Sequence, residues 1–364
     1  TPVPSSTAPQ VLSSWCSSSR GRTSIESTTC VGPFAADHVA GSGSSAAALV
    51  AQVAVETSLP HLDKVFDYSV PNTLVDQIAV GSRVRVRFAG ALVDGWVLSL
   101  SDQSSHTGTL LPVQRVIGDV PPLTPAIATL ARTVADRYAG TLTDVLRSAI
   151  PTRHAATETA VLNAVPEKLP RLSGSEDEVS RTDKQADGQA ERTAWVLPPG
   201  TDHWELVVRR IVDAASHGSV IAVLPDATDV AALAHELKRA AGSSSFVVLT
   251  ADSGPAKRWR AFLAARLGMS TIVIGTRAAV FAPVTNLSLL LIWDDGDDSH
   301  RELHAPYWHV REVAVARSAQ EGCDLVIAGR CVSTDAAALV ARGWMKVDKP
   351  SHGTAATVGP AIRA

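Results

Sequence analysis

The sequence predicts two folded domains of different classes, an α+β domain followed by an α/β domain. In residues 51–150, short runs alternate apolar with polar residues between turn residues, which predicts a small antiparallel sheet or barrel with helices. In residues 194–345, continuous Val/Ile/Leu runs alternate with helical patterns, which predicts a doubly wound parallel sheet. The length of 364 residues and the hydrophobic fraction of 45% are sufficient for a buried core in each domain.

The first domain reads as five short strands followed by two helices. Thr124 is a suitable N-cap and Pro125 fits the first position of the first helix, which Gly140 ends. A second short helix then runs to Ile150. The predicted strands are Gln52–Glu56, Val65–Val70, Ser82–Phe88, Val93–Leu100 and Val113–Ile117.

The second domain alternates strands and helices along its whole length. The predicted strands are Trp195–Leu197, Ser219–Leu224, Phe246–Leu249, Thr271–Ile274, Leu287–Trp293 and Asp324–Ala328. The predicted helices are Trp204–Ala215, Val230–Ala241, Ala256–Leu267, His309–Glu321 and Asp335–Ala341.

Three segments lack the pattern of a folded domain. Residues 1–50 contain twelve Ser and five Thr, and we expect a disordered tail. Residues 151–193 contain fourteen charged side chains and read as a solvated linker. Residues 346–364 read as a frayed tail.

Composition excludes several classes of protein. A net charge of −3 excludes a uniformly basic nucleic-acid coat protein but does not exclude a local basic groove. No uncharged apolar run is long enough to cross a membrane. The four cysteines form no C-x-x-C pair, which argues against a structural zinc site and a disulfide scaffold and favours a reducing cytoplasm.

The first strand–helix turn of the second domain lacks the groups that bind a triphosphate. Such a cradle needs free backbone N–H groups, a Lys and a Ser or Thr. This turn has Pro198 and Pro199, and His203 and Trp204 stand where Lys and Ser/Thr are needed. Gly200 and Thr201 are therefore at most a vestigial nucleotide site.

Two acids, Asp294 and Asp295, end the apolar strand that contains Leu289–Ile292. A Walker B motif has this pattern, with one carboxylate on magnesium and the next polarising water. The nearby His300 and His304 are spaced to chelate a metal, but their order is not that of a zinc protease, and an exposed polar loop is favoured. We therefore expect no metal site.

Basic residues suggest two contacts to a nucleic-acid backbone. Arg83, Arg85 and Arg87 alternate with apolar residues, so on a strand all three point to one face, within about 14 Å. The alternative is a solvated sheet face. Gly275-Thr276-Arg277 at the end of a strand is suited to a phosphate, or is an ordinary turn.

The segment Phe66-Asp67-Tyr68 places two aromatic residues around a carboxylate. Aromatic rings can stack on bases, and Asp can accept hydrogen bonds from a base edge or a sugar hydroxyl. On the sequence alone, the favoured alternative is a core Phe and Tyr on either side of an exposed Asp.

These segments, taken in order, resemble the PriA family of replication-restart proteins (primosomal protein N-prime). The resembling segments include Val65–Pro71, Gly81–Phe88 and Ile272–Pro283, and the specific parts are Phe66-Asp67-Tyr68 and Gly275-Thr276-Arg277. The resemblance implies a DNA 3′-end-binding domain over 51–150 and a RecA-like helicase lobe over 194–345. It implies that Phe66, Asp67 and Tyr68 form the 3′-end pocket with the turn Ala89-Gly90, and that Arg277 contacts a single strand.

The same resemblance implies that the motor is inactive. Where active members have GSGKT, DEEH and GSAT, this chain has Gly200–Trp204, Asp294–Asp297 and Gly329–Val332. We therefore doubt ATP and magnesium as cofactors. The family's winged-helix domain, zinc-binding cysteines and second motor lobe are missing from the sequence, so we expect a truncated, helicase-dead form.

We thus expect a DNA-binding replication-restart protein that recognises forked or single-stranded DNA through a nascent 3′ end, without helicase activity. The implied protein partners are single-strand-binding protein and the loader of the replicative helicase, with no membrane partner. Two alternatives stay open: an ATP-dependent 3′–5′ DNA helicase with residual ATPase activity from Asp294 and Asp295, and a non-catalytic primosome scaffold.

Overall fold

The computed structural model describes residues 49–57, 59–104, 106–164, 190–198, 202–242 and 245–349. The expected disordered tail lies outside these residues except for its last two, and so does most of the expected linker. Within the described ranges, no helix is long and apolar enough to span a membrane.

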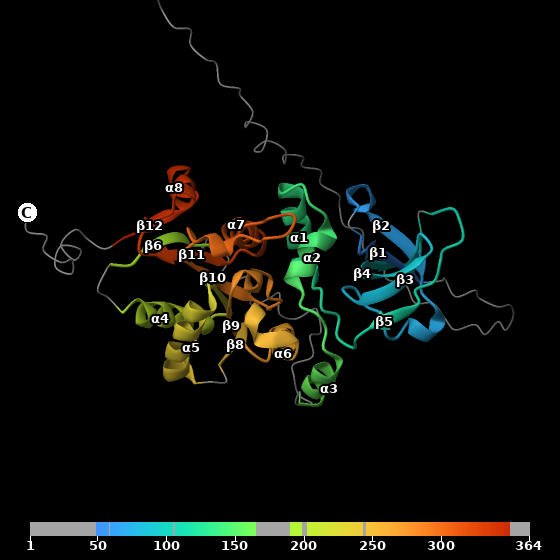
Figure 1. Cartoon of the computed structure of the whole chain (residues 1–364), viewed down its shortest axis with the longest axis horizontal. Helices are drawn as coiled ribbons and strands as arrows, with labels where there is room; N and C mark the ends of the chain where they lie inside the picture. Colours follow the sequence, from blue (N-terminus) through green and yellow to red (C-terminus); the bar gives the residue numbers. More distant parts are fainter. Residues whose placement is uncertain are drawn as a thin grey trace, which may run out of the picture. The chain divides into compact units, whose positions relative to one another are not determined.

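The first domain is built on a five-stranded antiparallel sheet, drawn in blue to cyan in Figure 1. Its strands pair in the order β2-β1-β4-β3-β5, and the segment 111–114 bonds to both β2 and β3 and partly closes the sheet into a barrel. Alternating apolar residues fill the inside, as the period of two requires. The strands are β1 (Val50–Val55), β2 (Val65–Ser69), β3 (Arg83–Phe88), β4 (Ala91–Ser101) and β5 (Arg115–Ile117).

Two helices follow this sheet, α1 (Pro125–Arg137) and α2 (Leu142–Ala149). Thr124 caps α1 as predicted, because its side chain accepts a hydrogen bond from the Ile127 N–H at 3.2 Å. Thr141 caps α2 in the same way. The chain turns between them at Ala139, which has a positive φ, rather than at the predicted Gly140.

The second domain is a seven-stranded parallel sheet in the order β12-β6-β11-β10-β7-β9-β8, which confirms the doubly wound prediction. Its strands are β6 (Arg192–Val196), β7 (Ser219–Val223), β8 (Phe246–Leu249), β9 (Ile272–Gly275), β10 (Leu287–Trp293), β11 (Asp324–Gly329) and β12 (Lys346–Asp348).

Helices cover both faces of this parallel sheet. On one face α4 (His203–Ala215) and α5 (Ala227–Ala241) pack on alternate strand residues such as Leu291. On the other face α6 (Gly254–Arg266), α7 (Val310–Glu321) and α8 (Thr334–Ala341) pack on the intervening residues such as Ile292. Burial on both faces explains why these strands are almost purely apolar.

Helices α1 and α2 share their core with the second domain. Apolar residues of both helices, including Leu130 and Leu146, belong to one buried cluster with Phe281 and Trp308. The Trp308 Nε1–H donates to the Ser148 hydroxyl at 3.2 Å. A Cβ at Gly140 would lie 2.4 Å from Pro306, so this close approach requires glycine. The two helices therefore join the first sheet to the second.

Two segments that we expected to be unstructured contain regular structure. Residues 155–164 of the expected linker form α3 (Ala155–Ala164), where the fully buried Glu158 pairs with Arg153 at 2.6 Å and accepts from the Asp119 N–H at 2.7 Å. Composition missed this helix because the charged residues were counted over 151–193 as a whole, whereas residues 155–164 contain one charged side chain, Glu158. Residues 346–348 of the expected tail form β12, which pairs with β6.

Candidate nucleic-acid interface and nucleotide site

The pleat of β2 separates the three residues Phe66, Asp67 and Tyr68. Phe66 and Tyr68 point into the core of the first sheet, whereas Asp67 points to the other face. Tyr68 is only 3% exposed, and its hydroxyl donates to the Arg87 carbonyl at 3.3 Å. Burial raises the pKa of this phenol. Tyr68 is therefore a core residue rather than an open stacking surface. This alternative is the one that the sequence favours for Tyr68.

Phe66 is the aromatic residue of β2 that stays partly accessible. Its ring packs edge-on against Phe88 with 4.8 Å between the ring centroids, and the Lys64 ammonium lies 5.4 Å from the Phe66 centroid. Because Phe88 directly precedes Ala89 and Gly90, this contact places the expected turn next to Phe66. Sequence reasoning missed Lys64, although its position two residues before Phe66, directly before β2, was a usable signal.

Asp67 lies on the outer face of the edge strand β2. It is half-buried, and its Oδ2 accepts a hydrogen bond from the Ser104 hydroxyl at 2.6 Å. The partner comes from the long segment between β4 and β5, which sequence periodicity could not place. Asp67 is thus held in one position at the edge of the sheet, on the opposite face from Phe66.

The turn Ala89-Gly90 joins β3 to β4 in a two-residue hairpin. Both residues have positive φ, 47° at Ala89 and 85° at Gly90, as expected of a type I′ turn. A Cβ added at Gly90 would have no neighbour within 4 Å, so the tip of the hairpin is open. The Gly90 carbonyl accepts a hydrogen bond from Arg87 at 3.1 Å.

The three arginines of β3 share one face, as predicted, but two of them are neutralised. Arg83 pairs with Glu56 at 3.0 Å and with Asp94 at 3.2 Å, and Arg85 pairs with Asp94 at 2.7 Å. Within the described residues, Arg87 has no carboxylate partner. The hairpin register around Ala89-Gly90 places Asp94 opposite Arg85 and could have revealed that pair. The cationic face is therefore weaker than its sequence suggests.

Aromatic side chains cluster beside the expected nucleotide site. His203 stacks on Trp293 with 4.9 Å between ring centroids and an interplanar angle of 15°, and Trp204 contacts both rings. Arg330 donates to His203 Nδ1 at 2.8 Å and to the Pro198 carbonyl at 2.7 Å. Burial, and then the charge of Arg330, lower the pKa of His203. Gly200 and Thr201 lie outside the described residues.

Asp295, the second acid after β10, has a structural partner. It is buried, its Oδ2 lies 2.8 Å from Arg311 Nη1, and the same oxygen accepts from the Ser333 hydroxyl at 2.7 Å. Arg311 also contacts Asp335 at 2.5 Å. The guanidinium of Arg311 stabilises the ionised form of Asp295 and holds it in the fold, so Asp295 is poorly placed as a general base.

Asp294, by contrast, is exposed and has a positive φ of 49°. Burial raises the pKa of the nearby Asp229, and the negative charges of Asp226, Asp294 and Asp297 raise it further. These acids oppose the approach of a triphosphate. The described residues contain no group of three His, Cys, Asp or Glu side chains placed to hold a metal ion.

His300 and His304 do not come together as ligands. The buried His300 donates from Nε2 to the Trp293 carbonyl at 2.9 Å, and burial lowers its pKa. His304 donates from Nδ1 to Glu302 at 2.9 Å. Burial acts to raise the pKa of Glu302, but hydrogen bonds from His304 and Arg277 outweigh it and lower that pKa.

Arg277 follows β9 in a turn whose glycine is required by packing. A Cβ at Gly275 would lie 2.1 Å from the Leu249 carbonyl of the neighbouring strand β8. Only glycine therefore allows β9 to end this close to β8, which brings Thr276 and Arg277 to the edge of the sheet. Arg277 pairs with Glu302 at 3.0 Å through Nε.

Comparison with known proteins agrees with this arrangement. Residues 52–151 match the family of the PriA 3′DNA-binding domain (3′BD). The resemblance to PriA is confirmed. The probable replication restart protein PriA of Mycobacterium tuberculosis (strain CDC 1551 / Oshkosh) is 42% identical over 79% of this chain and 45% of that protein. That of Mycobacterium leprae is 39% identical over 79% of this chain and 46% of that protein.

More distant relatives extend the same comparison. PriA of Treponema pallidum is 26% identical over 78% of this chain and 45% of that protein. This PriA-like chain therefore spans less than half the length of these relatives. Solved structures match only loosely: RecG bound to a three-way DNA junction has a TM-score of 0.33 at 14% identity, covering 62% of this chain and 30% of RecG.

The Asp295–Arg311 pair predicts different roles for the two acids after β10. Asp295→Asn leaves the buried Arg311 without its main counter-charge, and we expect the free energy of unfolding to fall by about 3 kcal/mol. Asp294→Asn keeps a residue that tolerates positive φ and is expected to change stability by no more than about 0.5 kcal/mol. Chemical denaturation measures both variants, and equal stabilities would contradict the assignment.

The N-cap of α7 predicts a dependence of stability on pH. His309 Nδ1 accepts from the Arg311 N–H at 3.1 Å, and burial, then Arg311 and His300, lower the pKa of His309 to about 4. Folding therefore disfavours its protonation, so stability is full above the unfolded pKa of about 6.5 and falls as the pH drops toward 4. Thermal melts should show a smaller loss between about pH 7 and pH 5 for His309→Asn, which keeps the cap. The same loss in both proteins would refute this role.

Proposed function

We propose that this chain is a replication-restart protein that binds forked DNA through the 3′ end of a nascent strand, and that its helicase lobe does not hydrolyse ATP. The match of residues 52–151 to the PriA 3′DNA-binding domain carries the first half of the proposal. The contacts of His203, Trp204, Trp293 and Arg330 beside the expected nucleotide site support the second half. Single-strand-binding protein and the loader of the replicative helicase are its proposed protein partners, in the cytoplasm.

The proposed 3′-end site lies at the edge of β2. The half-buried Phe66 offers a ring face beside the open tip of the hairpin Ala89-Gly90, and Asp67 offers a carboxylate on the outer face of the same strand. Because β2 is the last strand of its sheet and the segment 111–114 bonds to it at Ser69, beyond Asp67, one nucleotide could reach both faces around the edge at Phe66 and Asp67. Phe66 would stack on the terminal base, while Asp67 would accept from the sugar hydroxyl.

The ion pairs of β3 leave its arginines a smaller role in DNA binding than the sequence suggested. Arg83 and Arg85 already pair with Glu56 and Asp94, so they add little free positive charge. Arg87 at the hairpin and Lys64 above Phe66 are better placed to contact a phosphate. We therefore propose Arg87 and Lys64 as the backbone contacts of the first domain, and no longer Arg83 and Arg85.

A DNA-binding role predicts that a free 3′-OH matters. The chain should bind a fork with a free 3′-OH more tightly than one whose 3′ end is blocked. We expect this preference to be roughly tenfold, since one or two hydrogen bonds to a charged acceptor contribute about that much. Asp67→Ala should abolish it. Fluorescence anisotropy on matched forks measures the affinities.

The matched control for Asp67 is Asp76→Ala, which removes the same charge from an exposed position in the same domain. The control should keep the preference for the free 3′-OH, and both variants should show a nearly unchanged dependence of affinity on salt. Equal binding of free and blocked forks by the unmodified chain would remove the 3′-end proposal.

The principal alternative is a helicase lobe with residual ATPase activity. We expect no DNA-stimulated ATP hydrolysis, since the sequence of the turn 198–204 contains no lysine and the polar side chain of His203 is bound by Arg330 and stacked on Trp293. A phosphate-release assay with and without forked DNA tests this. Hydrolysis that disappears in Asp294→Asn would support the alternative and defeat ours.

A third candidate is a non-catalytic primosome scaffold that does not contact DNA. The shared core of α1, α2 and the parallel sheet suits a rigid scaffold equally well. The two proposals differ in one measurement, since a pure scaffold would bind neither forked nor single-stranded DNA even at low salt.

A further inference from the structure

A cavity of about 380 Å³ lies between α2 and the edge of the parallel sheet where β8 and β9 end. We call it the α2 cavity. Four further segments line it: the residues after β8, helix α6, the turn after β9 and residues 302–305. Its polar and charged lining includes Asp144, Arg147, Thr250, Arg258, Arg277 and Glu302.

The charges that line the α2 cavity do not cancel. Arg147 pairs with Asp144 at 3.2 Å, and Arg277 pairs with Glu302 at 3.0 Å. The half-buried Arg258 has no carboxylate partner among the residues that the structure describes. A guanidinium that is partly removed from water and lacks a counter-ion favours an anion, and its planar donors match a phosphate.

The rest of the lining is suited to a nucleotide rather than to a bare ion. The Phe262 ring, which stacks on Trp259, contributes an apolar wall together with Leu249, Ala149 and Pro151. The hydroxyl of Thr250 lies nearby, hydrogen-bonded to Ser253 at 2.6 Å. The volume is at the lower end of the range for small-molecule sites, roughly 300–1,000 Å³, which is adequate for one nucleotide unit.

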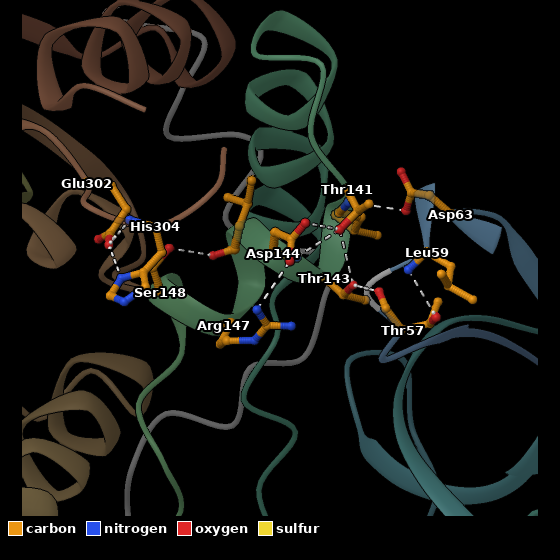
Figure 2. Close-up of polar contacts among 12 residues, drawn as sticks. Thr57, Leu59, Asp63, Thr141, Thr143, Asp144, Arg147, Ser148, Glu302 and His304 are labelled. Carbon is orange, nitrogen blue, oxygen red and sulfur yellow. Dashed lines mark hydrogen bonds and ion pairs between the residues drawn. The ribbon is translucent and has the colours of Figure 1, made fainter. Parts of the chain in front are cut away.

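Helix α2 connects this cavity to the proposed 3′-end site. Figure 2 shows that the first turn of α2 contacts the segment before β2. The Leu142 N–H donates to Asp63 at 3.1 Å, and the Thr143 hydroxyl donates to the Thr57 carbonyl at 3.3 Å. The last turn carries Arg147 and Ser148 to the α2 cavity. Eight residues of helix span about 12 Å, so a strand that occupied both sites would run beside α2.

We propose that the α2 cavity binds one nucleotide of single-stranded DNA, with its phosphate on Arg258 and with Arg147 as a second contact from the first domain. This inference rests on the proposed function, and it adds residues that the resemblance to PriA did not indicate. It also gives α2 a role in binding besides its role in packing. Arg277 completes the cationic side of the cavity.

The test is Arg258→Ala, with Arg260→Ala as the matched control. Arg260 is an exposed residue of the same helix and does not line the cavity, so both variants lose one charge from α6. Fluorescein-labelled oligothymidylates, one with a free 3′-OH and one with a 3′-phosphate, serve as probes in anisotropy titrations over a range of salt concentrations.

We expect Arg258→Ala to weaken binding of both oligonucleotides equally, by roughly three- to tenfold, and to lower the slope of log K against log salt by about 0.7. Arg258→Lys should keep the slope because it keeps the charge. Arg260→Ala should resemble the unmodified chain. An equal effect on both probes separates this site from the 3′-end pocket.

The remaining outcomes each decide the question. If Arg258→Ala binds DNA as Arg260→Ala does while the preference for a free 3′-OH persists, the cavity proposal falls and the proposed function stands. If inorganic phosphate raises the melting temperature in an Arg258-dependent way but DNA affinity is unchanged, the cavity is a free-phosphate site and the DNA proposal is wrong. If the unmodified chain binds neither oligonucleotide at low salt, both proposals fall.

Discussion

The buried cluster that α1 and α2 share with the parallel sheet is the constraint on which the rest of the molecule depends. Each helix is amphipathic, and its apolar stripe must be covered to be stable. Residues of the first sheet, such as Trp96, lie in the same cluster as Leu146 of α2 and Phe281 of the second domain. The core is therefore continuous from one sheet to the other, and the boundary expected at residue 150 divides the sequence but not the packing.

A continuous core fits the proposal that the second domain does not hydrolyse ATP, because this domain supports the first sheet whether or not it binds a nucleotide. In a two-lobed motor, the nucleotide holds parts of the protein in place, and its loss leaves polar groups unpaired. Here the substituted positions satisfy one another, because Arg330 bonds to His203, which stacks on Trp293. Asp295 is likewise paired with Arg311. The side chains at these positions thus satisfy one another's charges and hydrogen bonds without a bound phosphate.

Much of the fold was predictable because it depends on local periodicity. Thr124 and Pro125 predict the start of a helix from local sequence alone. The alternation in β3 likewise places three arginines on one face, whatever residues surround them. The failures involve side-chain partners that periodicity and composition do not reveal. Burial of Glu158 in α3 depends on Arg153 and on the Asp119 N–H, and a composition count cannot see such neutralisation. Residue type alone could not distinguish a core Tyr68 from a stacking one.

The same distinction between local pattern and distant partner governs the candidate DNA contacts. A cation contributes to backbone binding only if its charge is free, and β3 loses most of its charge to Glu56 and Asp94. With a net charge of −3, the chain has no general attraction for DNA, so binding must come from a few unneutralised groups. The groups that we propose are Lys64 and Arg87 near the edge of β2 and Arg258 in the α2 cavity. They belong to different domains, so a strand can contact all of them only if α1 and α2 hold the two sheets together, which makes the shared core a condition of binding as well as of stability.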